Sequence, residues 1–293
     1  MRITNSMIVS TTLENISANA RRLEDLQNKI SSGKRVRRPA DDPVAVARVL
    51  GLKTELRQIE QYQRNIEGAK AWLQVTESAL GGVSAVVQRA RELAVSGATE
   101  TLTASERAAI AAEVGQLFAS ALQLGNTRYA SQYVFAGFKI STPPFQAAAN
   151  PQGYAYQGDG GAIKREIEVN ATIVVNTSGQ EVFPQVLQGV KALLDGLNAS
   201  STAQIQSSIG LLDSGLEAVL AEEAEVGAKV NRLAAADERL QDIGVNVLSV
   251  LSSTEDLDMA KGLMDFSAQQ NVYQASLKAG AYAVQPSLLD YLS

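Results

Sequence analysis

The chain has 293 residues, of which 45% are hydrophobic and 5% aromatic, and it contains no cysteine and no histidine. Without these two residue types, disulfides, thiol nucleophiles and the common zinc sites are excluded, and the usual imidazole acid, base or metal ligand is missing. The net charge of -5 gives no whole-chain signature of nucleic-acid binding, and the sequence holds no run of 18 apolar residues that would predict a bilayer span.

Residues 1–13 lack the charged and apolar segments and the small-residue cleavage site of a signal peptide, so we expect no cleaved signal peptide. The first predicted element is a helix from about Ser10 to Ser31. Gly33 fits the position just beyond its end, and a basic connector follows. Since no aromatic or glycine-rich companion marks a phosphate site, we interpret the connector as a loop that is either solvated or paired with acidic neighbours. One helix face is apolar at three- and four-residue steps, through Leu13, Ile16, Ala20, Leu23, Leu26 and Ile30.

A second helix is predicted to begin at Pro43. Asp41 or Asp42 can cap its exposed N–H groups, and proline is favourable at a first helical position. An acid–base pair of the two aspartates is the alternative, which the capping role makes unnecessary. The apolar seam of this helix runs from Val49 to Ala94.

Thr103 and Glu106 have the spacing of a capping box for a third helix. After Asn126, tyrosine, phenylalanine, glycine and proline become frequent, and we expect a small β-rich insertion over residues 141–182. We interpret Gly158-Asp159-Gly160-Gly161 as a hairpin turn. It lacks the spaced acidic ligands of a calcium loop and the strand-to-helix setting of a phosphate loop.

The longest seam lies in the second half of the chain. Helical pattern resumes at Phe183, and alternating three- and four-residue steps then run from Ile205 to Leu251. This spacing predicts a helix about 50 residues long, or roughly 75 Å, which needs partner helices for stability. We therefore predict a mainly α fold: a long antiparallel helical or coiled-coil bundle formed by paired N- and C-terminal regions, with a small β-rich insertion.

Residues 253–256 are typical of a cap, and we expect them to start a last helix that reaches Val284. Its apolar residues occupy two faces, more than the first helix can cover, which is typical of a polymerising protein. We predict an assembly interface drawn from both ends of the chain: Leu13, Ile16, Leu23, Ile30, Leu257, Met259, Leu263, Phe266, Tyr273, Leu277 and Val284.

Several stretches resemble the flagellin superfamily, namely residues 2–7, 30–35, 38–43 and 61–66. Others are more similar to the hook-associated proteins of the hook–filament junction, within that superfamily, than to filament flagellins. These are residues 126–128, 133–137, 144–145, 156–159 and 287–292.

The resemblance implies three domains. They are an inner assembly domain (1–42 with 255–293), a helical rod (43–140 with 183–254) and an outer insertion (141–182). It also implies a structural protein outside the cell, at the hook–filament junction of the bacterial flagellum, exported unfolded through the type III apparatus. The expected partners are another hook-associated protein, flagellin, an export chaperone, and copies of the chain in a ring. We expect no cofactor, metal, nucleic-acid binding or membrane insertion.

Filament flagellin is the alternative function, and a secreted coiled-coil adhesin or translocator is a more distant one. An enzyme is disfavoured, because its only plausible acids lie at helix caps or on solvated helix faces. These acids are Asp41, Asp42, Glu222, Glu223 and Asp256.

Overall fold

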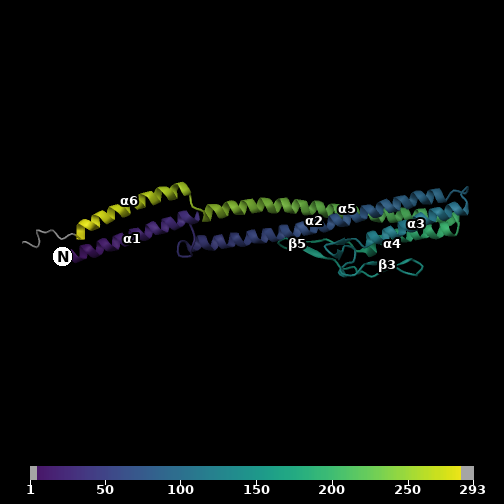
Figure 1. Cartoon of the computed structure of the whole chain (residues 1–293), viewed down its shortest axis with the longest axis horizontal. Coiled ribbons are helices and arrows are strands. Elements are labelled where there is room, and N and C mark those ends of the chain that lie inside the picture. The colour runs from purple at the N-terminus through teal and green to yellow at the C-terminus, as the bar shows by residue number, and fades with distance from the viewer. Residues whose placement is uncertain (1–4, 285–293) are drawn as a thin grey trace, which may run out of the picture. The chain divides into compact units, whose positions relative to one another are not determined.

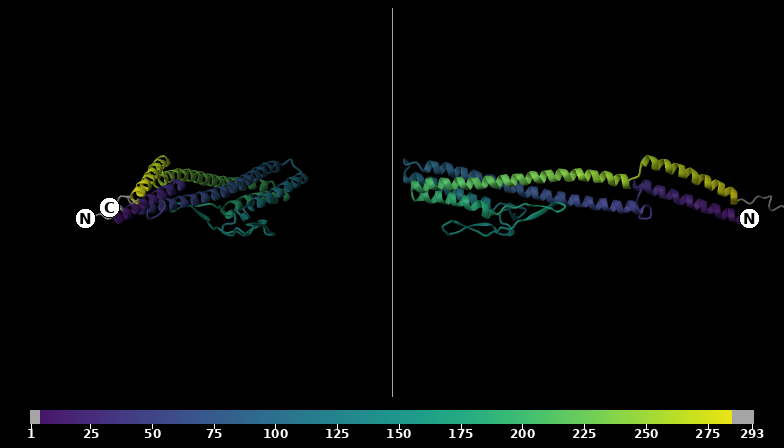
Figure 2. Two further views of the ribbon diagram at one scale, coloured as in Figure 1. Left: turned by 60° about the vertical axis from the view of Figure 1, so that its left-hand side comes forward. Right: turned by 180° about the vertical axis from the view of Figure 1, so that it is seen from behind.

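The computed structural model describes residues 5–284, with the side chains of Met7 and of residues 9–282. That part of the chain forms α1 (Asn5–Ser32), α2 (Pro43–Gly97), α3 (Ala104–Gly125), α4 (Gly179–Asn198), α5 (Thr202–Glu255) and α6 (Met259–Val284), with six short strands between α3 and α4. The helices from the two ends of the chain, α1 and α6, lie side by side (Figures 1 and 2). This arrangement confirms the predicted mainly α fold with a small β-rich part.

The chain divides into two compact units. The first holds the residues up to Gln58 and those from Ile243 onward, and the second holds Ile59–Asp242. Both boundaries fall inside a long helix, α2 or α5, and not at the helix ends that the resemblance implied. The division between an inner assembly domain and a helical rod at residues 42/43 and 254/255 therefore stays a prediction.

The core of the second unit is formed mainly by the predicted helix seams. Every seam position of α2 from Ile66 to Ala94 is buried, and the seam of α5 alternates buried and half-buried positions. Each large apolar side chain that is fully buried contributes about 1.5–3 kcal/mol relative to an exposed one. Packing of the α5 seam, more than helix propensity, therefore stabilises this 54-residue helix. The buried positions of the α5 seam include Ile205, Leu212, Val219, Val226, Leu233 and Leu240.

Two charged residues interrupt the α5 seam, and they differ in how they are accommodated. Asp237 pairs with Lys70 of α2, with 3.0 Å between Oδ2 and Nζ. At Glu223, burial and then the negative charge of Glu77 raise the pKa of the carboxyl. The charge of Asp237 is therefore compensated by Lys70, whereas an ionised Glu223 destabilises the packing of the seam.

The predicted capping box of α3 is confirmed. The hydroxyl of Thr103 accepts a hydrogen bond from Glu106 N (3.3 Å), and Glu106 Oε2 accepts one from Thr103 N (2.7 Å). One turn later, the buried Arg107 donates to the carbonyls of Gly97 (3.3 Å), Thr99 (3.0 Å) and Ser200 (3.4 Å). Gly97 ends α2, and Ser200 follows α4. The guanidinium therefore binds carbonyls that have no partner within a helix, and its positive charge lies at the negative dipole ends of these two helices.

Within the described residues, α3 is the helix whose length and apolarity would allow it to cross a membrane. It packs against α4 in the bundle, and its buried residues include Val114, Ala121 and Gly125. Many of its other apolar residues are alanines. We therefore interpret its apolarity as that of a bundle helix with a packing face.

The strands form three antiparallel pairs. They are β1 (Arg128–Tyr129) with β2 (Gln132–Tyr133), β3 (Phe145–Ala147) with β4 (Tyr154–Tyr156), and β5 (Lys164–Glu168) with β6 (Ala171–Val174). The first pair precedes the predicted insertion. Its two-residue turn, Ala130-Ser131, has positive φ at both positions. The turn lacks the asparagine and glycine from which such a turn is usually predicted.

The interpretation of Gly158–Gly161 as a hairpin turn is wrong. This segment connects β4 to β5, which belong to different strand pairs. Its aspartate instead fixes two loops, because Asp159 Oδ1 accepts hydrogen bonds from Phe138 N (2.7 Å) and Gly161 N (3.0 Å).

Candidate assembly surface

The two end helices pair in an antiparallel way. Gln269 of α6 donates to the side-chain oxygen of Asn19 at 3.3 Å. A Cβ added at Gly262 would contact Ile30, and one at Gly280 would crowd Ile16, so the helices approach closely at both glycines. On α6 the least exposed positions recur every three or four residues, at Gly262, Phe266, Gln269, Tyr273, Ser276 and Gly280.

The structure separates the predicted interface residues into two groups. Half-buried at or beside the α1–α6 contact are Ile16, Leu23, Ile30, Leu257, Phe266 and Tyr273. Exposed are Leu13, Met259, Leu263 and Leu277. Val284 ends α6, and its side chain lies outside the described residues.

The paired helices leave further apolar side chains in water, including Met264, which is 65% exposed, and Tyr282, which is 80% exposed. Met7 and Val272 are also exposed. Exposed apolar residues at neighbouring positions make this surface a candidate for contact with another protein.

Further exposed apolar residues of the same unit were missed by the sequence analysis. They include Val44 and Leu50 on α2 and Val245 and Leu248 on α5. All four lie off the seams, where a large aliphatic residue has no partner within the bundle. That off-seam placement is the signal that could have identified them.

A short connection joins the end of α1 to the turn between α5 and α6. Arg35 N donates to the carbonyl of Glu255 (2.8 Å), and Leu257 N donates to the carbonyl of Gly33 (2.9 Å). Lys34 and Asp256 form an isolated antiparallel bridge between the two segments. Backbone hydrogen bonds therefore fix the segment after α1 to the α5–α6 turn.

Glu255 is the buried carboxylate of this connection, with only 6% of the residue exposed. Its Oε1 accepts hydrogen bonds from Lys34 Nζ (2.6 Å) and Lys53 Nζ (2.7 Å). Burial alone raises the pKa of Glu255, but the hydrogen bonds from the two lysines outweigh it and lower the pKa overall. The hydrogen bond with Glu255 in turn raises the pKa of Lys34.

The expectation that residues 253–256 start the last helix is wrong, because α5 continues through Glu255. The residue that caps the N-terminus of α6 is Asp258. Its Oδ1 accepts hydrogen bonds from the N–H groups of Ala260 (3.0 Å) and Lys261 (3.1 Å).

The two aspartates before α2 bind different backbone segments. Asp42 Oδ1 accepts hydrogen bonds from Val44 N (3.1 Å) and Ala45 N (2.9 Å), in the first turn of the helix that Pro43 begins. Asp41 Oδ2 instead accepts from the N–H groups of Arg38 (2.9 Å) and Arg37 (3.1 Å) in the basic connector. These bonds hold the pKa of Asp41 below its ordinary value.

Among the described residues, no group of three or more metal-ligating side chains lies close enough together to hold a metal ion. The features of the first unit are instead an exposed apolar helix surface and the hydrogen-bonded connection between the segment after α1 and the α5–α6 turn. Such a surface can drive association by burying apolar area.

The comparisons with known proteins cover both ends of the chain. Residues 3–139 match the family described as bacterial flagellin N-terminal helical region, and residues 209–292 match its counterpart, bacterial flagellin C-terminal helical region. The chain belongs to the flagellin superfamily. It is a structural component of the bacterial flagellum, with a role in motility. The matched regions contain the helices that pair in the first unit.

Relatives of two kinds match over nearly the whole chain. Flagellar hook-associated protein 3 of Escherichia coli is 27% identical over 308 residues, which cover 95% of this chain and 96% of the relative. Flagellin of Bacillus subtilis is 27% identical over 298 residues, covering 97% of each. The chain is therefore equally identical to a hook-associated protein and to a flagellin.

Solved structures share the fold. FlgL of Bacillus cereus superposes with a TM-score of 0.61 at 22% identity, covering 69% of this chain and 99% of that one. Flagellar hook-associated protein 3 of Legionella pneumophila gives a TM-score of 0.63 at 16% identity, covering 69% and 97%.

Proposed function

We propose that this chain is a junction subunit that joins the flagellar hook, through another hook-associated protein, to the flagellin filament. The observation that carries this proposal is the similarity to hook-associated protein 3 of Escherichia coli over nearly the full length of both chains. A filament subunit is the second candidate, because flagellin of Bacillus subtilis matches with the same identity.

Polymerisation is proposed to bury the apolar surface of the first unit between neighbouring copies, which form a ring at the hook end. Each large side chain that a neighbour covers fully contributes about 1.5–3 kcal/mol before the entropy of ordering is subtracted. Exposed apolar residues occur on α1 and α6 and also on the parts of α2 and α5 in this unit. Several such contacts per subunit can therefore hold the chain in a closed or helical array.

Export is proposed to precede folding, through the flagellar type III apparatus and with a chaperone that shields the apolar end helices. The chain has no cysteine, so no disulfide would oppose threading of an unfolded chain. We propose that the protein functions outside the cell, at the hook–filament junction.

Stepwise assembly followed by electron microscopy tests the proposal. Isolated hooks bearing the other hook-associated protein would be mixed with this chain, and flagellin would be added afterwards. A junction subunit forms a short layer that stops growing, and filaments then start only from ends that carry it. Unlimited growth of this chain alone would identify a filament subunit, and flagellin growth at the same rate without it would contradict the junction role.

A further inference from the structure

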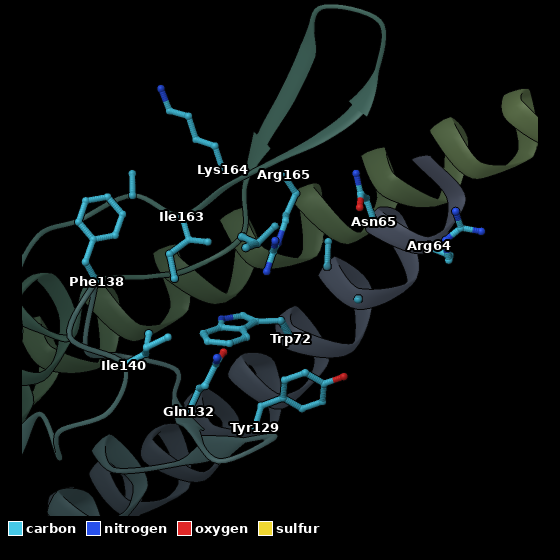
Figure 3. Close-up of a pocket in the computed structure, with 14 residues that line it drawn as sticks. Arg64, Asn65, Trp72, Tyr129, Gln132, Phe138, Ile140, Ile163, Lys164 and Arg165 are labelled. Carbon is cyan, nitrogen blue, oxygen red and sulfur yellow. The ribbon is translucent and has the colours of Figure 1, made fainter. Parts of the chain in front are cut away.

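A groove of about 650 Å³ in the second unit combines an apolar floor with a positively charged rim (Figure 3). It lies between α2, the β1–β2 hairpin and the segment that leads into β5. Trp72, Phe138 and Ile163 supply apolar surface, and Arg64, Lys164 and Arg165 supply positive charge. Among the residues that the structure describes, no aspartate or glutamate lines it.

Trp72 lies at the centre of the groove with an unused hydrogen-bond donor. The residue is only 6% exposed, and its indole Nε1 is buried without a partner. The ring packs edge-to-face on Tyr129, and its nitrogen edge is turned towards Ile163 and Arg165 (Figure 3). A buried donor without an acceptor costs about 1–3 kcal/mol, so an occupant that supplies the acceptor would remove this cost.

Phe138 exposes its ring at the groove although its backbone is held firmly. The residue is 63% exposed, and its N–H donates to Asp159 at 2.7 Å. The preceding Gly137 has a φ of +69°, and a Cβ at Gly161 would clash with the Phe138 ring. An exposed aromatic ring that its surroundings fix in place loses little entropy on binding.

The β5 wall of the groove is fixed to both long helices. Asn65 of α2 donates to the carbonyl of Glu166 at 2.8 Å. Arg239 of α5 donates through Nε to Glu168 at 2.6 Å. The groove is therefore formed before any occupant arrives.

The cations at the rim have little internal compensation. In the part of the chain that the structure describes, no carboxylate lies within 4.0 Å of Lys164 or Arg165. Arg64 reaches Glu60 only at 4.0 Å, and both side chains are largely exposed. The local positive charge contrasts with the net charge of -5 of the whole chain, and it favours a negatively charged occupant.

We propose that this groove binds an acidic segment of a protein partner, one with a bulky apolar side chain next to its carboxylates. A carboxylate pairs with Arg165 and Lys164, whose long, exposed side chains can shift to let an acceptor reach the Trp72 N–H. The apolar side chain packs on Phe138 and Ile163. A nucleic acid or polyphosphate would use the charges but not the apolar floor. The proposal does not depend on the junction function.

Trp72 is the only tryptophan of the chain, so its fluorescence reports directly on the groove. The full chain would be titrated with acetyl-Glu-Leu-Asp-Phe-Glu-amide and with the neutral peptide acetyl-Gln-Leu-Asn-Phe-Gln-amide. We expect the acidic peptide to shift the Trp72 emission and to bind at least ten-fold more tightly, with an affinity that falls as salt is added. Equal responses to the two peptides, or an equal response to inorganic polyphosphate, would overturn the proposal.

Variants test the assignment to this groove. Lys164→Glu with Arg165→Glu should weaken acidic-peptide binding at least ten-fold, whereas the matched double reversal Lys261→Glu with Lys278→Glu on α6 should not. Trp72→Phe, followed by calorimetry, and Phe138→Ala should each weaken binding several-fold. The thermal midpoint of each variant shows whether it folds. Unchanged affinity in folded Lys164/Arg165 and Phe138 variants would refute the site.

Discussion

Replacing Glu255 with glutamine should loosen the connection between α1 and the α5–α6 turn. The variant keeps the shape of the side chain but removes the negative charge to which Lys34 and Lys53 donate at 2.6 and 2.7 Å. Removing one partner of a buried charge pair costs about 3–5 kcal/mol. Because the lysine side chains are 40% and 39% exposed, water screens part of the effect, and we expect a loss of about 1–3 kcal/mol.

Hydrogen exchange can measure this loss locally. The amides of Arg35 and Val36 donate to the Glu255 carbonyl, and that of Leu257 donates to Gly33. A loss of about 1–3 kcal/mol lowers their protection factors by roughly 5- to 150-fold. The matched control is Glu225→Gln, which removes a carboxylate that is 60% exposed and pairs with Lys229 one helical turn away, and it should change protection little. Unchanged protection of the three amides in Glu255→Gln would refute the role given to this carboxylate.

The same contacts predict how the connection responds to pH. The pKa of Glu255 is lowered from 4.5, so its contribution is complete above that value and is lost as the pH falls through the lowered pKa. The pKa of Lys34 is raised from 10.5, so its contribution is complete below that value and is lost as the pH rises through the raised pKa. Protection of these amides should therefore be greatest between about pH 5 and pH 10, and equal protection at pH 3 would contradict this.

Three further substitutions test other parts of the structure. Arg107→Met should lower the free energy of unfolding of the second unit by about 2–4 kcal/mol, because three carbonyls lose their donor, and Trp72 fluorescence in urea would show it. Glu223→Gln should raise that free energy by up to about 1 kcal/mol at pH 7, since burial disfavours the ionised carboxylate; a lower denaturation midpoint would contradict this. Asp42→Ala should cost about 1 kcal/mol as a lost helix cap, and an unchanged urea midpoint by circular dichroism would count against it.

Periodicity predicted the long helices well because their seams are apolar and regular. Ile205 to Leu251 keeps three- and four-residue steps over the whole of α5, and burial follows those steps closely. The α1–α6 contact was harder to predict. Its α6 side has Gly262, Ser276 and Gly280 among the least exposed positions, and a pattern of apolar residues does not register glycine and serine, whose small size permits close helix approach.

Long-range polar contacts could not be predicted from local pattern. Glu255 resembled a helix cap because it follows serine and threonine, yet its partners Lys34 and Lys53 lie about 200 residues away in sequence. No sequence pattern marks Arg107 either, because only the fold brings three carbonyls to it. The groove around Trp72 depends on four separate segments, so no single stretch of sequence indicates it.

Methionine oxidation tests most directly the claim that assembly buries the apolar surface of the first unit. Met7, Met259 and Met264 lie on α1 and α6 and are 59%, 44% and 65% exposed. Dilute hydrogen peroxide would be applied to the free chain and to the chain assembled at hook ends, and sulfoxide would be quantified at each position by mass spectrometry. The account predicts rapid oxidation of all three in the free chain and strong protection after assembly. Equal oxidation in both states would contradict it.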